Sequence, residues 1–345
     1  MSETGESSTL AQPAGFRPER DPRAPHPVFQ WPVKPQAVLK WLFGFPGLLW
    51  PVQAVLIGIS FLTWRFLTPD TQTLRHFSAD WVGFLFIRNV LLLTAFVSIW
   101  HFWLYVRKAQ GSQYKYNANW LATDDPVFLF RNQLWDNVFW NIFSAVPIWT
   151  AYEAVGLWLQ ANELVPVVDW RAHPIYCTVL LCFGGVLWAD IHFYFTHRLI
   201  HWRPLYRYVH SLHHKNVNVG PWSGLAMHPV EHVIYFSSVI LFWIIPSHPL
   251  HAMRHLQELA LGASLAHHGF DRLVVGEKAT FDMEHYTHYL HHKHVQCNFG
   301  VDVVPLDRWL GTFHDGSDES YERLKNRLRA RALRSRATVK KASAS

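Results

Sequence analysis

The 345-residue chain is short of charge, since only 16% of its residues are Asp, Glu, Lys or Arg while 50% are hydrophobic. Soluble domains usually carry about 25% charged residues, so a purely soluble protein is disfavoured. The chain also holds 18 tryptophans, a residue that gathers where membrane meets water because its ring is apolar and its N–H donates a hydrogen bond. The composition therefore favours an integral membrane protein.

Cysteine is scarce as well, with three copies that show neither C-x-x-C spacing nor an even framework. Cys177, Cys182 and Cys297 are therefore expected to be inert apolar residues in a reducing compartment. This scarcity disfavours a thiolate zinc site and an iron–sulfur cluster. The chain likewise shows no signal peptide, no cytochrome b5 pattern and no ferredoxin-like cysteine pattern.

Four apolar runs reach the length of about 20 residues that a helix needs to cross a membrane. They cover residues 41–66, 81–106, 138–159 and 175–195. Arg88 interrupts the second run and Glu153 the third. A further run at 233–245 is too short to span, and we expect it to be re-entrant or interfacial, paired with 255–266. The sequence thus predicts an all-α membrane protein with about four transmembrane helices.

Basic residues alternate between the segments that flank these runs. The leader and the next three loops hold five, one, four and one Lys or Arg, and the chain after the fourth run is rich in both. The positive-inside rule then predicts that both termini are cytoplasmic. Residues 1–40 contain seven prolines and are predicted to be a disordered leader, followed by membrane helices at 41–172. The basic tail at 319–345 suits a surface near anionic lipid better than nucleic acid, because no nucleic-acid recognition motif accompanies it.

Histidine is the one residue whose distribution is strongly uneven, because 18 of the 23 copies fall between His192 and His294. Three groups have spacings of three or four residues, which place side chains on one face of a helix. These groups are His197 and His201, then His210, His213 and His214, and finally His288, His291 and His292. Buried imidazoles without partners would each cost about 1–3 kcal/mol, a cost that a metal centre removes.

The residues alone restrict the identity of the metal less than they restrict the positions of its ligands. A zinc hydrolase needs about three ligands with a Glu as base, whereas eight or more imidazoles are on offer and no H-E-x-x-H occurs. So many neutral nitrogen donors suggest two metals and suit iron, copper or zinc. Redox chemistry with iron is the natural use beside a membrane. A metal transporter is disfavoured, because the histidines sit at the ends of the apolar runs and not along them.

The order H-x-x-x-H, H-x-x-H-H, H-x-x-H-H after apolar runs resembles the fatty acid hydroxylase/sterol desaturase superfamily. Four shorter stretches agree with it: "FTHRLIH", "HPVE", "HHGF" and "CNFGVDVVPLDRWLGTFHDG". The resemblance covers roughly residues 175–316 and implies a catalytic domain at 173–318 that forms a cytoplasmic His-rich helical cap. The membrane would be a bacterial inner membrane or the endoplasmic reticulum.

The resemblance also implies a ligand set and a chemistry. Two further histidines join the three groups, one in "HPVE" and one in "HHGF", where His268 competes for the same role. The implied metal ligands are His197, His201, His210, His213, His214, His228, His267, His288, His291 and His292. The expected carboxylate partners of the rings are Asp190, Glu231, Asp282, Glu284, Asp302 and Asp307, with helix capping or solvation at the surface as the alternative role for Asp302 and Asp307.

These ligands would hold two non-haem irons that use O2 and external electrons to hydroxylate or desaturate a C–H bond of a membrane lipid, either sterol-like or fatty acyl. The electron donor would be a cytochrome b5-like protein or a ferredoxin with its reductase. A basic surface that includes Arg198, Arg203, Arg207 and Lys215 would attract it. The alternative is a zinc-dependent membrane hydrolase that acts on lipid.

Overall fold

The computed structural model describes residues 15–18, 25–276, 279–283 and 285–342, and within them the chain is mostly helical. Four helical segments are long and apolar enough to cross a membrane, as the sequence predicts. They are Leu49–Phe66, Ala79–Val106, Gln133–Ala161 and Pro174–Ile200. Only 17% of the apolar window of the first segment and 22% of that of the fourth are buried inside the molecule. Most of this apolar surface therefore faces outward, as it does in a protein surrounded by lipid.

Each of these segments is built from consecutive elements, with π-helical turns at the junctions. The first comprises η2 (Leu49–Gln53) and α2 (Ala54–Phe66), and the second comprises α4 (Ala79–His101) and η3 (Phe102–Val106). The third comprises α5 (Gln133–Trp140), η4 (Asn141–Ala145) and α6 (Val146–Ala161). The fourth comprises α7 (Pro174–Val179), η5 (Leu180–Gly184) and α8 (Gly185–Ile200). The short helix α3 (Thr71–Leu74) connects the first two segments.

The two charges that interrupt the apolar runs meet in the interior. Arg88 of α4 donates to both carboxylate oxygens of Glu153 of α6 at 2.5 Å, and both side chains are buried. Asn89 donates to the same carboxylate at 2.9 Å. The pair thus neutralises two charges that would be costly next to lipid, and it fixes the second segment against the third.

A helical hairpin follows the fourth segment. Its first arm comprises α11 (Pro229–Phe236), η8 (Ser237–Ile240) and α12 (Leu241–Ile244), and its second arm is α13 (Pro249–Ala266). The predicted pairing of these regions is confirmed by a 2.7 Å bond between Ser238 Oγ and His255 Nε2. Both arms begin with a proline after a histidine whose Nδ1 accepts a backbone N–H, so each start is capped.

The turn of this hairpin reaches the loop between the third and fourth segments. Ser247 N donates to Pro166 O at 3.1 Å, and His251 Nε2 lies 2.9 Å from Cys177 O near the start of α7. The hairpin therefore runs along the bundle and does not lie flat at its end, which corrects the interfacial alternative. Hydropathy could not reveal this, because 14 of the 18 residues of α13 are buried among neighbours and polar side chains are tolerated there.

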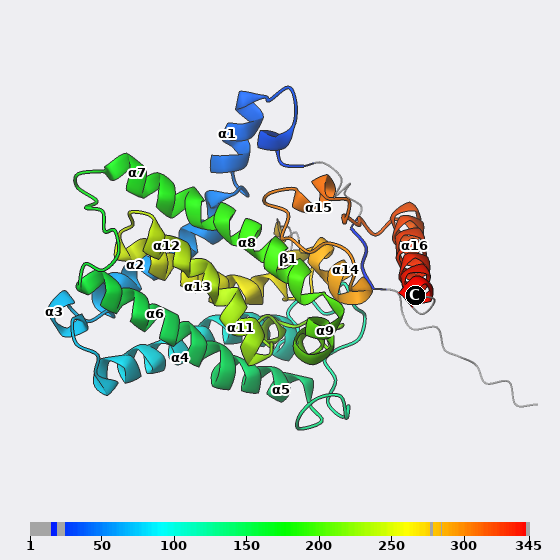
Figure 1. Ribbon diagram of the computed structural model, residues 1–345, viewed down its shortest axis with the longest axis horizontal. Coiled ribbons are helices and arrows are strands. Elements are labelled where there is room, and N and C mark those ends of the chain that lie inside the picture. Colours follow the sequence, from blue (N-terminus) through cyan, green and yellow to red (C-terminus); the bar gives the residue numbers. More distant parts are fainter. Residues whose placement is uncertain (1–14, 19–24, 277–278, 284, 343–345) are drawn as a thin grey trace, which may run out of the picture.

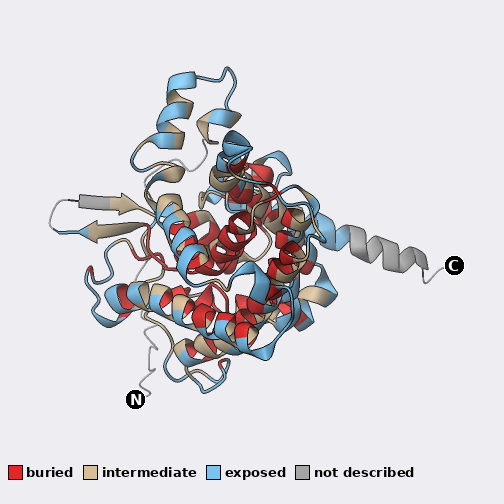
Figure 2. Ribbon diagram, turned by 90° about the vertical axis from the view of Figure 1, so that its left-hand side faces the viewer, coloured by how far each residue is buried: buried red, intermediate tan, exposed pale blue. Residues whose placement is uncertain are grey.

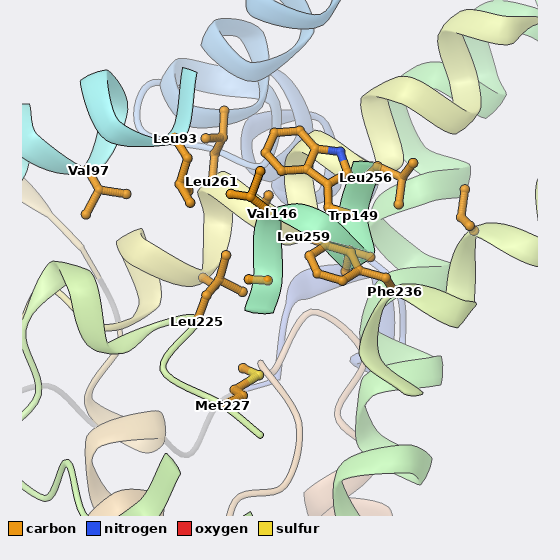
Figure 3. Packing of buried hydrophobic residues seen from close by; sticks show 14 of the residues in the cluster. Leu93, Val97, Val146, Trp149, Leu225, Met227, Phe236, Leu256, Leu259 and Leu261 are labelled. Atoms are coloured by element: carbon orange, nitrogen blue, oxygen red, sulfur yellow. The ribbon is translucent and has the colours of Figure 1, made fainter. Parts of the chain in front are cut away.

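The core of the bundle lies around α13, which contacts α2, α4, α6 and α8 (Figure 1). Figure 2 shows the buried residues concentrated in the middle of the molecule. The largest cluster of buried apolar side chains joins Trp149 of α6 and Phe236 of α11 to Leu256 and Leu261 of α13 (Figure 3). The central helix is thus enclosed by the segments predicted to span, and its position is set by apolar packing.

The remaining elements surround one end of the bundle. They are α9 (Arg203–Leu205), η6 (Tyr206–His210), α10 (Ser211–His214), η7 (Pro221–Ser223), α14 (Tyr286–His294), α15 (Leu306–Trp309) and α16 (Asp318–Ala342). The N-terminal η1 (Pro27–Phe29) lies within the predicted leader, whereas α1 (Pro35–Phe43) begins in the leader and ends inside the first predicted run. The rest of the leader is outside the described residues apart from 15–18 and a few linking positions.

A β-hairpin is the exception to the all-α prediction. β1 (Arg272–Val275) pairs antiparallel with β2 (Ala279–Asp282), with Arg272 opposite Asp282. The side chains of these two residues form an ion pair of 3.4 Å across the strands. Leu-Val-Val in β1 favours a strand, and Gly276 follows with a φ of 66°, which suits a turn.

Candidate metal centre

The three predicted histidine groups converge at one end of the bundle, although they come from separate elements. The first group ends α8, where His197 lies in the last turn and His201 is the C-cap. The second group runs from the end of η6 through α10, and the third lies on α14. All of these side chains are buried, at 5% exposure or less. Burial of so many imidazoles together requires a specific arrangement of their nitrogen atoms.

The nitrogens form two clusters, in each of which the candidate ligand atoms lie within 4.8 Å of one another. The first cluster contains His197, His201, His210, His214 and His291. The second cluster contains His213, His267, His288 and His292. The two are neighbours, since the rings of His214 and His292 have centroids 5.0 Å apart. The structure therefore brings together nine of the ten histidines predicted as ligands.

The repeated H-x-x-H-H spacing explains how two helices serve both clusters. In the second group, positions i and i+4 (His210 and His214) enter the first cluster and position i+3 (His213) enters the second. In the third group, the assignment is reversed: His288 and His292 enter the second cluster and His291 the first. Adjacent histidines thus point to different clusters, and each of these helices bridges the two.

The distances within the clusters match those around a metal ion. In the first cluster, the Nε2–Nε2 distances are 3.1 Å for His197 and His210, 3.0 Å for His291 and His214, and 3.3 Å for His214 and His201. In the second, His267 Nε2 lies 3.0 Å from His292 Nε2 and 3.1 Å from His288 Nε2. Two nitrogens each about 2.1 Å from one ion would lie about 3.0–3.4 Å apart at the usual bond angles.

Proton positions strengthen the case for a cation. Nδ1 of His197 lies 2.8 Å from Phe299 O and Nδ1 of His291 lies 2.6 Å from Cys297 O. A carbonyl oxygen only accepts, so both Nδ1 atoms carry the proton and both Nε2 atoms of the neutral rings present lone pairs to the first cluster. His267 does the same in the second cluster, because its Nδ1 donates to Ala263 O at 2.7 Å. A metal ion fits such converging lone pairs, which otherwise repel one another.

Electrostatics keep these rings neutral and so keep the lone pairs available. Burial, followed by neighbouring histidines, lowers the pKa of His201 to about 2. Burial lowers the pKa of His267 to about 3, and the pKa values of His210, His214 and His292 lie well below 6.5 for the same reason. Neutral imidazole is the form that binds a metal ion.

The outer contacts of the rings come mainly from the backbone. Among the predicted carboxylates, Glu231 does meet an imidazole: its Oε1 lies 2.7 Å from His210 Nδ1. Asp190 instead accepts from the backbone N–H groups of Val301 and Val304, at 3.0 and 2.6 Å. Asp307 accepts from Phe299 N at 2.9 Å. These two aspartates therefore hold the loop that presents Phe299 O to His197 and do not touch the ligands themselves.

The other three predicted carboxylates behave differently. Asp282 pairs with Arg272 of the β-hairpin, and Asp302 hydrogen-bonds the side chain of Thr287. Glu284 lies outside the described residues. The carbonyls of Phe299, Cys297 and Ala263 are the ring partners that sequence reasoning missed. A side-chain pattern carries no signal for them, because every residue has a carbonyl.

One predicted ligand, His228, lies apart from the clusters, and the competing pair His267 and His268 separates. His228 lies in neither cluster, and its Nδ1 accepts from Val230 N at 3.2 Å as the cap of α11. In the same "HPVE" stretch, the residue that reaches the centre is Glu231. Of the pair His267 and His268, the former enters the second cluster, whereas Nδ1 of the latter accepts from Phe270 N at 3.0 Å.

A cavity of about 250 Å³ opens beside the second cluster. Of the described histidines that line it, His213, His267 and His288 belong to the second cluster and none belongs to the first. Its walls are mostly apolar and come mainly from η2, α2, α8 and α13, with Phe193 of α8 and Met227, which precedes α11, among them. A lipid-like molecule bound here would thus contact the second cluster and not the first.

Comparison with known proteins agrees with this site. The fatty acid hydroxylase family model matches residues 182–312, a stretch that contains all nine clustered histidines. This match supports the resemblance of that region to the fatty acid hydroxylase/sterol desaturase superfamily. It is 24% identical over 186 residues to a Delta(7)-sterol-C5(6)-desaturase of Nicotiana tabacum, covering 53% of this chain and 65% of the relative.

Two other relatives are similar to parts of the chain. A Delta(7)-sterol 5(6)-desaturase of Candida glabrata is 25% identical over 245 residues, covering 68% of this chain and 64% of the relative. Methylsterol monooxygenase 1 of Gallus gallus is 32% identical over 79 residues, covering 21% of this chain and 27% of the relative. The match thus spans less than two thirds of the tobacco and Candida proteins. No solved structure matches the chain significantly.

Proposed function

We propose that the protein is a membrane-bound non-haem di-iron oxygenase that uses O2 and two external electrons to hydroxylate or desaturate a C–H bond of a lipid. The supporting observation is the pair of adjacent imidazole clusters, one of which borders an apolar cavity. The relatives, which are sterol desaturases and a methylsterol monooxygenase, support the same chemistry and favour a sterol-like substrate.

Iron is favoured by the donor set, because nine neutral imidazole nitrogens and no thiolate form the two clusters. Bound iron would supply the oxidising power for this reaction. The overall reaction balances as R–H + O2 + 2e⁻ + 2H⁺ giving R–OH + H2O. Desaturation takes the same inputs, removes two hydrogens from adjacent carbons and gives two waters.

The protein contributes orientation and exclusion of water. Backbone carbonyls and Glu231 fix the rotation of four rings, so that each Nε2 faces its cluster. Phe193 packs against His197 with centroids 4.6 Å apart and also lines the cavity, so it covers the clusters on the lipid side. The apolar walls would hold a hydrocarbon against His213, His267 and His288 while keeping solvent out.

The electron donor is proposed to be a separate acidic carrier, cytochrome b5-like or ferredoxin with its reductase. Arg198, Arg203 and Arg207 are exposed near the end of α8 and can attract such a protein. Lys215 does not belong to this surface, because it is paired with the buried Asp136 at 2.8 Å. The rate of electron transfer from the carrier should fall as ionic strength rises, and a rate independent of salt would contradict this docking.

We place the protein in the membrane as a multi-pass protein with both termini on the cytoplasmic side of a bacterial inner membrane or the endoplasmic reticulum. The four long apolar segments and the alternation of basic residues between them support this topology. Reporter fusions at the two termini and in the loop between α6 and α7 test it. We expect the reporter to lie on the non-cytoplasmic side of the membrane only when it is fused into that loop.

The central test is untargeted lipid mass spectrometry on cells that express the protein, beside cells that express His213→Ala. A lipid that gains one oxygen or loses two hydrogens should appear only with the intact protein and only when O2 is present. Identical lipidomes, with folded protein and a native redox partner present, would contradict the proposal. Metal analysis would then test the zinc-dependent hydrolase, whose activity would not depend on O2.

A further inference from the structure

Besides the histidines and the aspartates Asp190 and Asp282, the cavity has a further polar region. Gln53 at the end of η2 and Glu258 of α13 both line it, among mostly apolar residues of the same walls. Glu258 and His267 are nine positions apart on α13 and its C-cap, which corresponds to about 13 Å along a helix at about 1.5 Å per residue. The cavity therefore extends along α13 from a carboxylate to the second cluster.

Three side chains form a closed network at this far region, which we call the polar trio: Gln53, Arg254 and Glu258. Gln53 Nε2 donates to Glu258 Oε1 at 2.9 Å, and Arg254 Nη1 donates to Glu258 Oε2 at 2.8 Å. Arg254 Nη2 also donates to Gln53 Oε1. Arg254 is 3% exposed and does not line the cavity, so it sits behind the other two and balances the charge of Glu258.

The trio still has hydrogen-bonding capacity on its cavity side. An amide nitrogen has two protons and each carboxylate oxygen accepts about two hydrogen bonds, whereas the network uses one proton of Gln53 Nε2 and one bond at each oxygen of Glu258. A hydroxyl group can donate to Glu258 and accept from Gln53 at once. A carboxylate would instead face the negative charge of Glu258.

We propose that the polar trio recognises the hydroxyl group of a lipid alcohol whose apolar body fills the cavity and whose oxidised carbon lies at the second cluster. This rests on the proposed oxygenase function and narrows its substrate class. Lipids with an uncharged hydroxyl at the end remote from the oxidised carbon, such as sterols and long-chain alcohols, are accepted. Free fatty acids that would place their carboxylate at the trio are rejected.

The test measures binding and does not depend on turnover. Purified full-length protein in lipid nanodiscs is incubated with tritium-labelled cholesterol or hexadecan-1-ol, and competitors displace the label. The competitors are the same alcohol, its methyl ether and palmitate. The intact protein should prefer at least one alcohol over its methyl ether by about tenfold, the equivalent of one hydrogen bond, and should bind palmitate more weakly still.

The variant Gln53→Met keeps the length of the side chain but removes its hydrogen-bonding groups, while Arg254 and Glu258 stay paired. It should abolish the preference for alcohol over ether and leave ether binding unchanged. The control Val186→Ala, which alters an apolar wall residue, should weaken both members of a pair by the same factor. A trio that only joined η2 to α13 would lower the unfolding temperature of the variant without altering the preference.

Three results would overturn the proposal: no binding of either alcohol, palmitate binding at least as tight as alcohol, or a preference that survives in Gln53→Met. The lipid mass spectrometry described above remains a separate measurement. Lipid oxidation without the alcohol preference would reject the role of the polar trio alone. An alcohol preference without any lipid oxidation would reject the oxygenase function.

Discussion

The two imidazole clusters are built from the same kind of residue but differ in what surrounds them. The first cluster has five histidines and is closed by protein, with Glu231 behind His210 and Phe299 packed against His201 at a centroid distance of 5.0 Å. The second has four, and three of them line the apolar cavity. An ion in the second cluster would have both fewer protein ligands and access to a bound molecule. For the proposed oxygenase, this difference implies a division of labour between a closed, supporting metal position and an open one that would meet the substrate.

The strongest test of this division removes one ring from each cluster. His201→Ala and His288→Ala should each reduce bound metal from about two ions per chain to about one, and each should bring lipid product below detection. The reason is that a buried cluster loses a nitrogen donor that no other side chain replaces. Metal content is measured by inductively coupled plasma mass spectrometry on purified protein. His228→Ala is the control, because His228 lies in neither cluster, and loss of metal there would contradict the assignment.

A substitution that blocks the cavity should separate lipid binding from metal binding. Gly262 lines the cavity, and a Cβ added there would meet only Glu258 Cγ at 4.0 Å, so Gly262→Leu has room and fills space that a lipid would use. Lipid conversion should fall by about tenfold or more, because about 1.4 kcal/mol of lost binding corresponds to a factor of ten. Metal content and unfolding temperature should stay unchanged.

Gly58→Leu is the matched control, since a Cβ at Gly58 meets nothing within 4 Å and the residue is exposed on α2. Both substitutions replace a helical glycine by the same side chain, so general effects of leucine cancel. Equal loss of conversion in the two variants would contradict the assignment of the cavity as the lipid site.

The support of the closed cluster can be weakened without removing a ligand. Glu231→Gln leaves the shape intact but weakens the hold on His210 Nδ1, so metal affinity at the first cluster should fall by about 10–100-fold. The second cluster serves as the internal reference and should keep its affinity. Titration with a chelator of known affinity measures both, and a parallel loss at the two clusters would show that they do not act separately.

Lowering the pH should reduce the stability of the metal-free protein, with a smaller effect than the substitutions above. The folded-state pKa values of His267 (about 3) and His201 (about 2) lie below the ordinary value of 6.5, so these rings are neutral when folded and bind protons more readily when unfolded. Their contribution to stability is complete above pH 6.5 and is lost as pH falls from there towards 3. The unfolding temperature in detergent should therefore drop by several degrees between pH 7 and pH 4. A constant temperature over this range would show that the metal-free rings are hydrated.

Comparison of the structure with the sequence-based predictions shows which features a local sequence pattern can reveal. Apolar runs located the four long segments, and the spacing of three and four residues placed the imidazoles on shared helix faces, because both are local periodicities. The partition of His213 and His214 into different clusters depends on which helices face one another. The burial of α13 depends on packing against other helices. The hydrogen bonds by which Asp190 holds the loop join residues more than 100 positions apart. No short sequence pattern reports these features or the loop contact made by Asp307.

Helix α13 sets the distance between the polar trio and the second cluster in steps of one helical turn. Glu258 and His267 are fixed to the same rigid element, so the separation between an anchored lipid and the histidines cannot vary continuously. It changes in steps of the helix repeat, about 5.4 Å for each turn. Moving the anchoring side chain from position 258 to position 262 would shift the lipid by one such step without altering any histidine. The site of oxidation could then evolve by relocation of a single polar residue, while the metal chemistry remained the same.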